Sequence, residues 1–311
     1  MMSRQNANDP DRRKLEILRK KLEEETGLLI DVPETADVPG TAKTLERLLS
    51  ACDDKRNTEE LLKKLLTEPL SLAEQMNDLQ CLRLPIDGVY TVFLIYLPRE
   101  KSGVDVSTVE ILKELFGQGS GDRFLDIGNS ILLFLHCLTE EREKNGSTDI
   151  PVMAEALLDT LNMELMLEAK ISCSRPHKAT ELCTAYTEAK KALDTGLAFS
   201  DSGHIYYYDC LGVRRLVFDL PKETCLEYLN EIFDGEIPER IDDELLKTAR
   251  VFFENGLNIS DTAKQMFIHR NTLIYRLEKL YRATGLDIRR FEDAFAFRNV
   301  ALIYERLRSG K

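Results

Sequence analysis

The stretch NISDTAKQMFIHRNTLIYRLEKLYRATG, residues 258–285, decides the fold of the C-terminal part of this chain. It predicts a short helix that ends near Met266, a tight turn, and a second helix over about 269–283. Ser260 is suited to cap the first helix, because its hydroxyl can accept a backbone N–H that has no partner within the helix. Gly285 is suited to end the second helix, since glycine adopts the left-handed conformation without penalty.

Three apolar or small residues support a helical hairpin packed on a core. Phe267 and Ile268 fall in the turn, so we expect the turn to pack on a core rather than to face water. Ala263 suits a close crossing of the two helices.

The second helix divides into two faces at 100° per residue. Leu273, Leu277 and Leu280 fall on one side and form the predicted buried seam. Arg276 lies at the border of the two faces, and Glu278 is the only acid outside the seam. The side chains predicted to face outward are Asn271, Thr272, Tyr275, Lys279 and Arg282.

These outward groups suit DNA, because amides and guanidinium groups pair with base edges, and ammonium, hydroxyl and phenol groups pair with phosphates. The pattern is that of a helix-turn-helix whose second helix enters the major groove. The residues expected at base edges and nearby phosphates are His269, Arg270, Asn271, Thr272, Tyr275 and Arg276. The residues expected at phosphates alone are Lys264, Lys279 and Arg282. The alternative is a helical hairpin whose polar face is merely solvated.

Residues 262–302, TAKQMFIHRNTLIYRLEKLYRATGLDIRRFEDAFAFRNVAL, resemble the C-terminal helix-turn-helix of the PucR/CdaR family, the bacterial regulators of purine catabolism and sugar diacids. The run IHRNTLIYRL is the most specific part, and Thr284, Gly285 and Asp287 follow at the family spacing. The resemblance covers about 70 residues, from Ile241 onward. It implies a transcription regulator that binds double-stranded DNA and controls a metabolic operon.

The charge distribution agrees with a DNA-binding C-terminal segment. The chain of 311 residues has a formal net charge of −12. Residues 241–311 hold 13 Lys and Arg against 10 Asp and Glu, so this segment is basic and the remaining 240 residues carry a net charge of −15. The acidic remainder slightly favours the rival function, a small-molecule sensor or protein-interaction scaffold whose C-terminal domain does not bind DNA.

The fold class predicted is α+β, in four parts: a helical region over 1–84, a sheet domain over 85–233, a linker over 234–240 and the helix-turn-helix domain over 241–311. In the helical region, 30–40 is expected to form a loop. Separate helices are expected over 41–54 and from Thr58, with a break at Pro69. The leucine stripes of this region predict core or dimer contacts.

The sheet domain has the predicted order β-α-β-β-α-β, followed by one more helix and strand. Strands are expected near 89–97, 165–173 and 204–209, with a hairpin over 122–136 that turns at Gly128 and Asn129. Helices are expected over 107–116, 150–162, 179–195 and 222–233. This order predicts a ferredoxin-like antiparallel sheet with helices on one face.

The segment AYTEAKKALDTG, residues 185–196, resembles a signature of the family's middle domain, a degenerate relative of the GGDEF nucleotide-cyclase fold. A working cyclase needs carboxylates to hold metal ions against a triphosphate. The first strand ends Tyr-Leu-Pro-Arg at 96–99, and the hairpin holds a single acid, Asp126. We therefore expect no enzyme activity and no cofactor.

The remaining features predict a cytoplasmic protein. No apolar stretch reaches the roughly 20 residues that cross a bilayer, and the N-terminus lacks the apolar core of a signal peptide. Seven dispersed cysteines indicate reduced thiols, and no His or Cys pair has metal-ligand spacing. A single recognition helix reads few base pairs, so a homodimer on paired half-sites is expected. About 80 residues precede the first strand, which is too few for a complete sensor domain. A small-molecule effector is therefore possible, but the sequence does not identify it.

Overall fold

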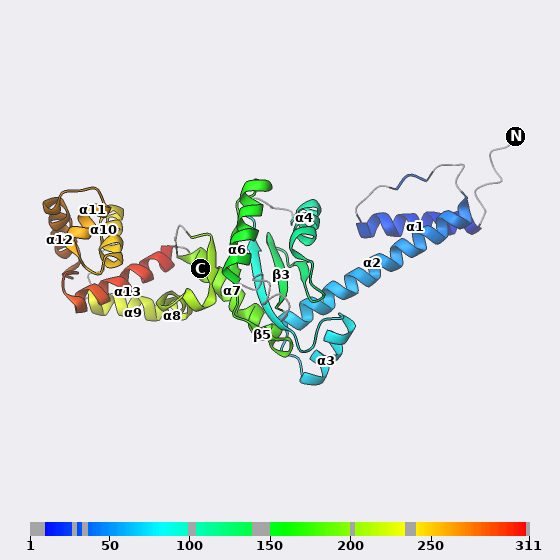
Figure 1. Cartoon of the computed structure of the whole chain (residues 1–311), viewed down its shortest axis with the longest axis horizontal. Helices are drawn as coiled ribbons and strands as arrows, with labels where there is room; N and C mark the ends of the chain where they lie inside the picture. Colours follow the sequence, from blue (N-terminus) through cyan, green and yellow to red (C-terminus); the bar gives the residue numbers. More distant parts are fainter. Residues whose placement is uncertain are drawn as a thin grey trace.

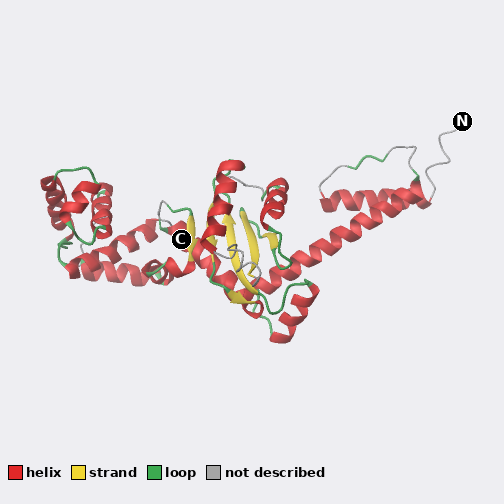
Figure 2. Cartoon of the chain, viewed as in Figure 1, coloured by secondary structure: helices red, strands yellow, loops and turns green. Residues whose placement is uncertain are grey.

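The computed structural model describes residues 10–26, 30–32, 37–98, 104–138, 150–199, 203–233 and 241–308. This part of the chain is α+β, with many helices around one sheet (Figure 2). The α-helices are α1 (Pro10–Thr26), α2 (Val38–Thr67), α3 (Leu72–Cys81), α4 (Val106–Phe116), α6 (Ile150–Asp159), α7 (Leu182–Ala198), α8 (Val213–Asp219), α9 (Lys222–Ile232), α10 (Asp243–Glu254), α11 (Ile259–Gln265), α12 (Arg270–Thr284) and α13 (Phe291–Arg308). Short helical turns are η2 (Thr160–Glu164, a π-helix), η3 (Ala179–Glu181) and η4 (Tyr208–Cys210). The strands are β1 (Val89–Tyr96), β2 (Arg123–Asp126), β3 (Ile131–Leu138), β4 (Lys170–Cys173), β5 (His177–Lys178) and β6 (Ile205–Tyr207).

The sheet has the strand order β2-β3-β1-β4-β6, and β5 pairs with the start of β1. The pairs β1–β3, β2–β3 and β1–β4 are antiparallel, with Phe93 opposite both Phe134 and Cys173. Strand β6 lies parallel to β4, with Ile205 opposite Ile171. The expectation of a wholly antiparallel sheet is therefore wrong at this edge, because α7 crosses over between β4 and β6 as a βαβ unit.

Helices cover both faces of the sheet, so the prediction of one covered face is wrong. Tyr90, Val92 and Leu94 of β1 face the end of α2, together with α3 and α7. Phe93 and Ile95 face α4 and α6. The continuous apolar run of β1 is the reason, because a strand buried on both faces has no polar side to expose to water.

The N-terminal region contains one continuous helix where two were expected. Helix α2 has 30 residues and includes Pro39 and Gly40 in its first turn, so the expected break before Thr58 is wrong. A proline in the first turn of a helix leaves no hydrogen bond unmade, since the N–H groups there lack helical partners anyway. Helix α1 lies along the first half of α2, and the second half of α2 reaches the sheet (Figure 1). The predicted break at Pro69 is confirmed, and Ser71 caps α3 in a capping box.

Several boundaries in the sheet domain differ from the sequence prediction. The hairpin turns at Gly128 and Asn129, as predicted, with φ of 82° and 53°. Strand β4 is shorter than predicted, and β6 gives way to η4. Helix α7 continues past Gly196 to Ala198, because that glycine serves a close approach: a Cβ there would lie 2.3 Å from the ring of Tyr206.

The C-terminal helices form one core with the helices that precede them. Helices α10, α11 and α12 group together, and α13 runs back from them alongside α8 and α9 towards the sheet (Figure 1). Phe199 and Leu229 from the sheet-domain side share this core with Phe252, Leu277 and Phe297. The predicted linker over 234–240 lies outside the described residues.

Candidate nucleic-acid interface

Helix α11 is capped by Asn258 rather than by Ser260, so the predicted cap is wrong by two residues. The Oδ1 atom of Asn258 accepts hydrogen bonds from the backbone N–H groups of Ser260 at 2.9 Å and Asp261 at 3.2 Å. An asparagine in extended conformation just before a helix is among the best caps. Behind this cap, Thr262 and Ala263 are buried, and Ala263 belongs to the same core as Leu273 and Leu277 of α12.

The turn between α11 and α12 does not bury Phe267, which contradicts the sequence prediction. Phe267 has a φ of 54° and a side chain that is 95% exposed. Its backbone N–H donates to the carbonyl of Lys264, and that of Ile268 donates to the carbonyl of Ala263. The left-handed backbone conformation closes the turn and directs the ring to solvent, while Ile268 is half-buried on the core.

Helix α12 begins and ends where the sequence predicts. The Nδ1 atom of His269 accepts the backbone N–H of Asn271 at 3.2 Å, so this imidazole caps the helix. Neutral His269 must then hold its proton on Nε2, which leaves Nε2 as a donor. Gly285 ends the helix with a φ of 73°, and its N–H donates to the carbonyl of Tyr281.

The leucine seam of α12 is buried as predicted, with Leu273, Leu277 and Leu280 each at most 2% exposed. Each buried leucine contributes about 1.5–3 kcal/mol of transfer free energy. The seam fixes the rotation of α12 about its own axis, which determines the side chains that face solvent. The exposed residues on or beside the opposite face are His269, Arg270, Asn271, Thr272, Tyr275, Lys279 and Arg282.

The structure therefore places eight of the nine proposed contact residues on one helix and its cap. Tyr275 is 69% exposed and lies near the middle of the helix. Lys264 lies apart on α11 and pairs with Asp261 at 3.6 Å, with its side chain 79% exposed. Arg276 is the least accessible of the nine, with a side chain 19% exposed.

Two cations of α12 are paired with acids at the start of α10, a feature that no pattern in the sequence predicts. Arg276 lies 2.5 Å from Glu244, and Lys279 lies 3.2 Å from Asp242. Asp242 also caps α10 through its Oδ1 atom, which accepts the N–H of Glu244 at 2.9 Å. Acids are common in the first turn of a helix, and here the same carboxylates neutralise part of the α12 surface. A DNA phosphate would compete with them for both cations.

Further acids lie at the other end of α12. Glu278 lies 3.8 Å from Arg282 and 3.4 Å from Arg289. The side chain of Arg289 also donates to Asp287, and this hydrogen bond holds the pKa of that carboxyl below its usual range. Helix α12 therefore presents cations that are weakly held by exposed carboxylates, a type of pairing that contributes only about 0–1 kcal/mol.

Two acids of the middle domain, Asp126 and Glu188, are held in internal contacts. Asp126, the acid of the hairpin, accepts the N–H of Gly128 at 2.8 Å through Oδ1 and that of Val104 at 3.2 Å through Oδ2. Buried Glu188 contacts Arg175 at 3.0 Å and His177 at 2.9 Å. Burial acts to raise the pKa of Glu188, but these hydrogen bonds outweigh it and lower the pKa.

The described residues contain no group of three or more His, Cys, Asp or Glu side chains placed to hold a metal ion. In the same part of the chain, no helix is both long and apolar enough to span a membrane.

Comparison with known proteins agrees with the geometry of the C-terminal domain. Residues 245–302 match the family model described as the PucR C-terminal helix-turn-helix domain. The chain is 34% identical over 131 residues to the purine catabolism regulatory protein of Bacillus subtilis (strain 168), a match that covers 42% of this chain and 24% of that protein. It is 40% identical over 180 residues to the uncharacterized protein YsfB of the same organism, covering 55% of this chain and 44% of that protein.

A third relative is the proline-responsive transcriptional activator PutR of Bacillus subtilis (strain 168), 32% identical over 117 residues, which cover 36% of this chain and 28% of that protein. The chain spans less than half the length of each of these three relatives. The C-terminal domain is thus similar to a PucR-type helix-turn-helix, and two of the three relatives are regulators by name.

Proposed function

We propose that this chain is a sequence-specific transcription regulator of the PucR/CdaR type that inserts α12 into the major groove of DNA. The observation that carries the proposal is the division of α12 into a buried leucine seam and an exposed face of amide, hydroxyl, phenol and cationic groups. The family match over 245–302 covers the same helices. We further propose that its target is a metabolic operon, as the names of the relatives suggest.

The roles of individual residues follow from their positions on α12. His269, Arg270, Asn271 and Thr272 lie at the N-terminal end, which reaches base edges in helix-turn-helix proteins. Tyr275 and Arg276 lie one turn further along, within reach of base edges and nearby phosphates. Lys264, Lys279 and Arg282 are assigned to phosphates, where a cation contributes affinity without sequence preference.

The experiment is a binding titration on a site selected from genomic fragments. We expect Asn271→Ala and Arg276→Ala to lose about 1–3 kcal/mol on the selected site and to relax its sequence preference. Lys279→Ala should weaken all sequences about equally and flatten the dependence on salt. Lys190→Ala, an equal loss of charge on α7, is the control. Unchanged affinity and preference in both the Asn271 and the Arg276 variant would refute the groove assignment.

The acid pairs of Arg276 and Lys279 favour a second candidate function, a sensor or scaffold in which this domain no longer binds DNA. In that case α10 would hold both cations permanently. The same titration separates the two functions, because a scaffold of this kind would select no fragment above the background set by salt-dependent non-specific binding.

We propose a homodimer that binds paired half-sites in the cytoplasm. The support is geometric, since one recognition helix contacts too few base pairs for high specificity. The hairpin of α1 and α2 is the proposed dimer contact, because Ile17 and Leu48 are exposed on it. Light scattering that shows a monomer on DNA-free protein at high concentration would count against this assembly.

We also propose that the middle domain is a ferredoxin-like, GGDEF-type fold without cyclase activity. Strand order β2-β3-β1-β4 with antiparallel neighbours supports the fold. The hydrogen bonds of Asp126 to two backbone N–H groups support the lack of activity, since this carboxylate already serves the loops around it. A nucleotide-triphosphate turnover assay with magnesium should show no product.

A further inference from the structure

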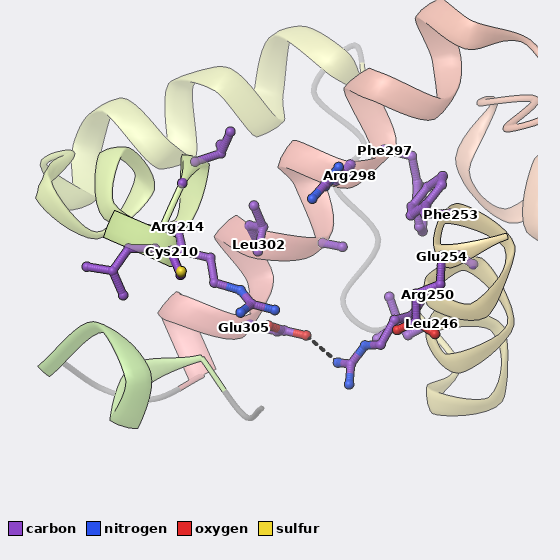
Figure 3. Close-up of a pocket in the computed structure, with 15 residues that line it drawn as sticks. Cys210, Arg214, Leu246, Arg250, Phe253, Glu254, Phe297, Arg298, Leu302 and Glu305 are labelled. Carbon is purple, nitrogen blue, oxygen red and sulfur yellow. Dashed lines mark hydrogen bonds and ion pairs between the residues drawn. The ribbon is translucent and has the colours of Figure 1, made fainter. Parts of the chain in front are cut away.

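A cavity of about 440 Å³ lies where the sheet domain meets the C-terminal helices. Helix α13 forms one wall, α10 the second, and the segment from Cys210 to Arg214 the third. Figure 3 shows Arg298 and Leu302 on α13 between the α10 side and the side that carries Arg214. The volume falls in the range of about 300–1,000 Å³ that is typical of small-molecule sites.

The lining of the cavity combines an apolar surface with an excess of positive charge. Phe253, Phe297 and Leu302 supply apolar surface. The charged side chains in the lining are Arg214, Arg250, Arg298, Glu254 and Glu305, which leaves one positive charge in excess. Arg250 and Glu305 lie 2.8 Å apart and neutralise each other across the cavity (Figure 3).

Arg298 is the residue best placed to receive an anion. Its side chain is exposed at the cavity, and within the described residues it forms no ion pair. A guanidinium group binds a carboxylate through two parallel hydrogen bonds, which gives direction as well as affinity. An arginine that forms no ion pair within the described residues, beside aromatic and aliphatic side chains, suits a ligand with one negative charge and an apolar body.

We propose that this cavity binds a small monocarboxylate with an apolar body, whose carboxylate pairs with Arg298 and whose body packs against Phe253 and Leu302. The position of the cavity also suggests that the bound ligand affects DNA binding. This part of the proposal rests on the function proposed above. Helix α10 carries Arg250 and Phe253 in the cavity wall and, two turns earlier, Glu244 beside Arg276 of α12. A ligand that shifts α10 would change the ion pair between Glu244 and Arg276.

The test uses the full chain and 3-phenylpropionate as the probe, with 3-phenylpropionamide as the neutral control of equal shape. Isothermal titration should show binding of the acid and about tenfold weaker binding of the amide, as expected for loss of a charge-assisted pair. Arg298→Gln should weaken binding of the acid by about the same factor and leave binding of the amide unchanged. Arg290→Gln removes another exposed arginine, outside the cavity lining, and should change the binding of neither compound.

A second variant tests the cavity without touching its charge. Ala301→Leu adds apolar volume to the lining, so it fills part of the cavity and should weaken binding of both the acid and the amide. Absence of acid binding, or acid binding that neither Arg298→Gln nor Ala301→Leu weakens, would overturn the assignment.

The link to DNA is measured separately, with the selected site and with saturating 3-phenylpropionate. We expect DNA affinity to differ by about fivefold or more between the bound and free states, the lower range of typical coupling between sites. Equal affinities in both states would remove the link and leave the cavity assignment intact. Failure to bind DNA in either state would count against the proposed function, while the titration of the acid would still decide the cavity.

Discussion

Glu244→Gln should strengthen DNA binding if Arg276 leaves its internal partner to contact DNA. The two side chains lie 2.5 Å apart, with Glu244 56% exposed and Arg276 19% exposed. An exposed ion pair contributes about 0.2–1 kcal/mol, and the partial burial of Arg276 places this pair near the upper end. Removal of the carboxylate also removes one negative charge beside the phosphates.

The expected gain is therefore about twofold to fivefold in affinity for the selected site. Fluorescence anisotropy with labelled DNA at fixed salt measures the gain, and thermal unfolding confirms that the domain stays folded. The matched control is Asp219→Asn on α8, since Asp219 forms an ion pair with Lys191 and its side chain is similarly exposed.

A double-mutant cycle completes the design. In the Arg276→Ala background, Glu244→Gln should have a much smaller effect, because the cation that it releases is gone. The reasoning would be refuted if Glu244→Gln changed affinity no more than Asp219→Asn does, or if its effect were the same with and without Arg276.

Three further predictions concern stability, each measured by chemical denaturation of the full chain. Asn258→Ala should cost about 1 kcal/mol, because two N–H groups of α11 lose their cap, whereas Ser260→Ala should cost little. Gly196→Ala should cost about 1–3 kcal/mol, since the added methyl group meets the Tyr206 ring, while Gly203→Ala, with 3.7 Å of clearance, should be tolerated. The free energy of unfolding should fall as pH drops below 4.5, the ordinary pKa of Glu188. The pKa of Glu188 is lowered in the folded state, so its ionised carboxylate stabilises the fold above pH 4.5. This contribution is lost as pH falls through the pKa of the folded state. Glu188→Gln should flatten this part of the profile; an unchanged profile would contradict the assignment.

The sequence predicts those features that depend on local periodicity. The leucine spacing of α12 gives both its buried seam and its exposed face, and Gly285 marks its end. The strong apolar run of β1 gives a strand. These signals are local, because helical and extended backbones repeat every 3.6 and every 2 residues.

Features that depend on distant parts of the chain are missed. Glu244 is 32 residues from Arg276, and no spacing rule links an acid in one helix to a cation in another. Local patterns do not show that α4 and α6 return to cover the second face of the sheet. The prediction that Phe267 is buried is wrong, because hydrophobicity favours burial while the left-handed turn directs the ring outward. The cavity is built from three segments and has no signature in any one of them.

The uninterrupted course of α2 has a consequence for local unfolding. Its first half shares with α1 a core in which five described residues are buried, whereas Leu62, Leu65 and Leu66 near its end belong to the much larger core of the sheet. Amide hydrogens along this single helix should therefore exchange with solvent at two distinct levels, rapidly beside α1 and slowly near the sheet. We therefore expect the hairpin of α1 and α2 to unfold locally while the sheet domain that anchors the end of α2 stays folded.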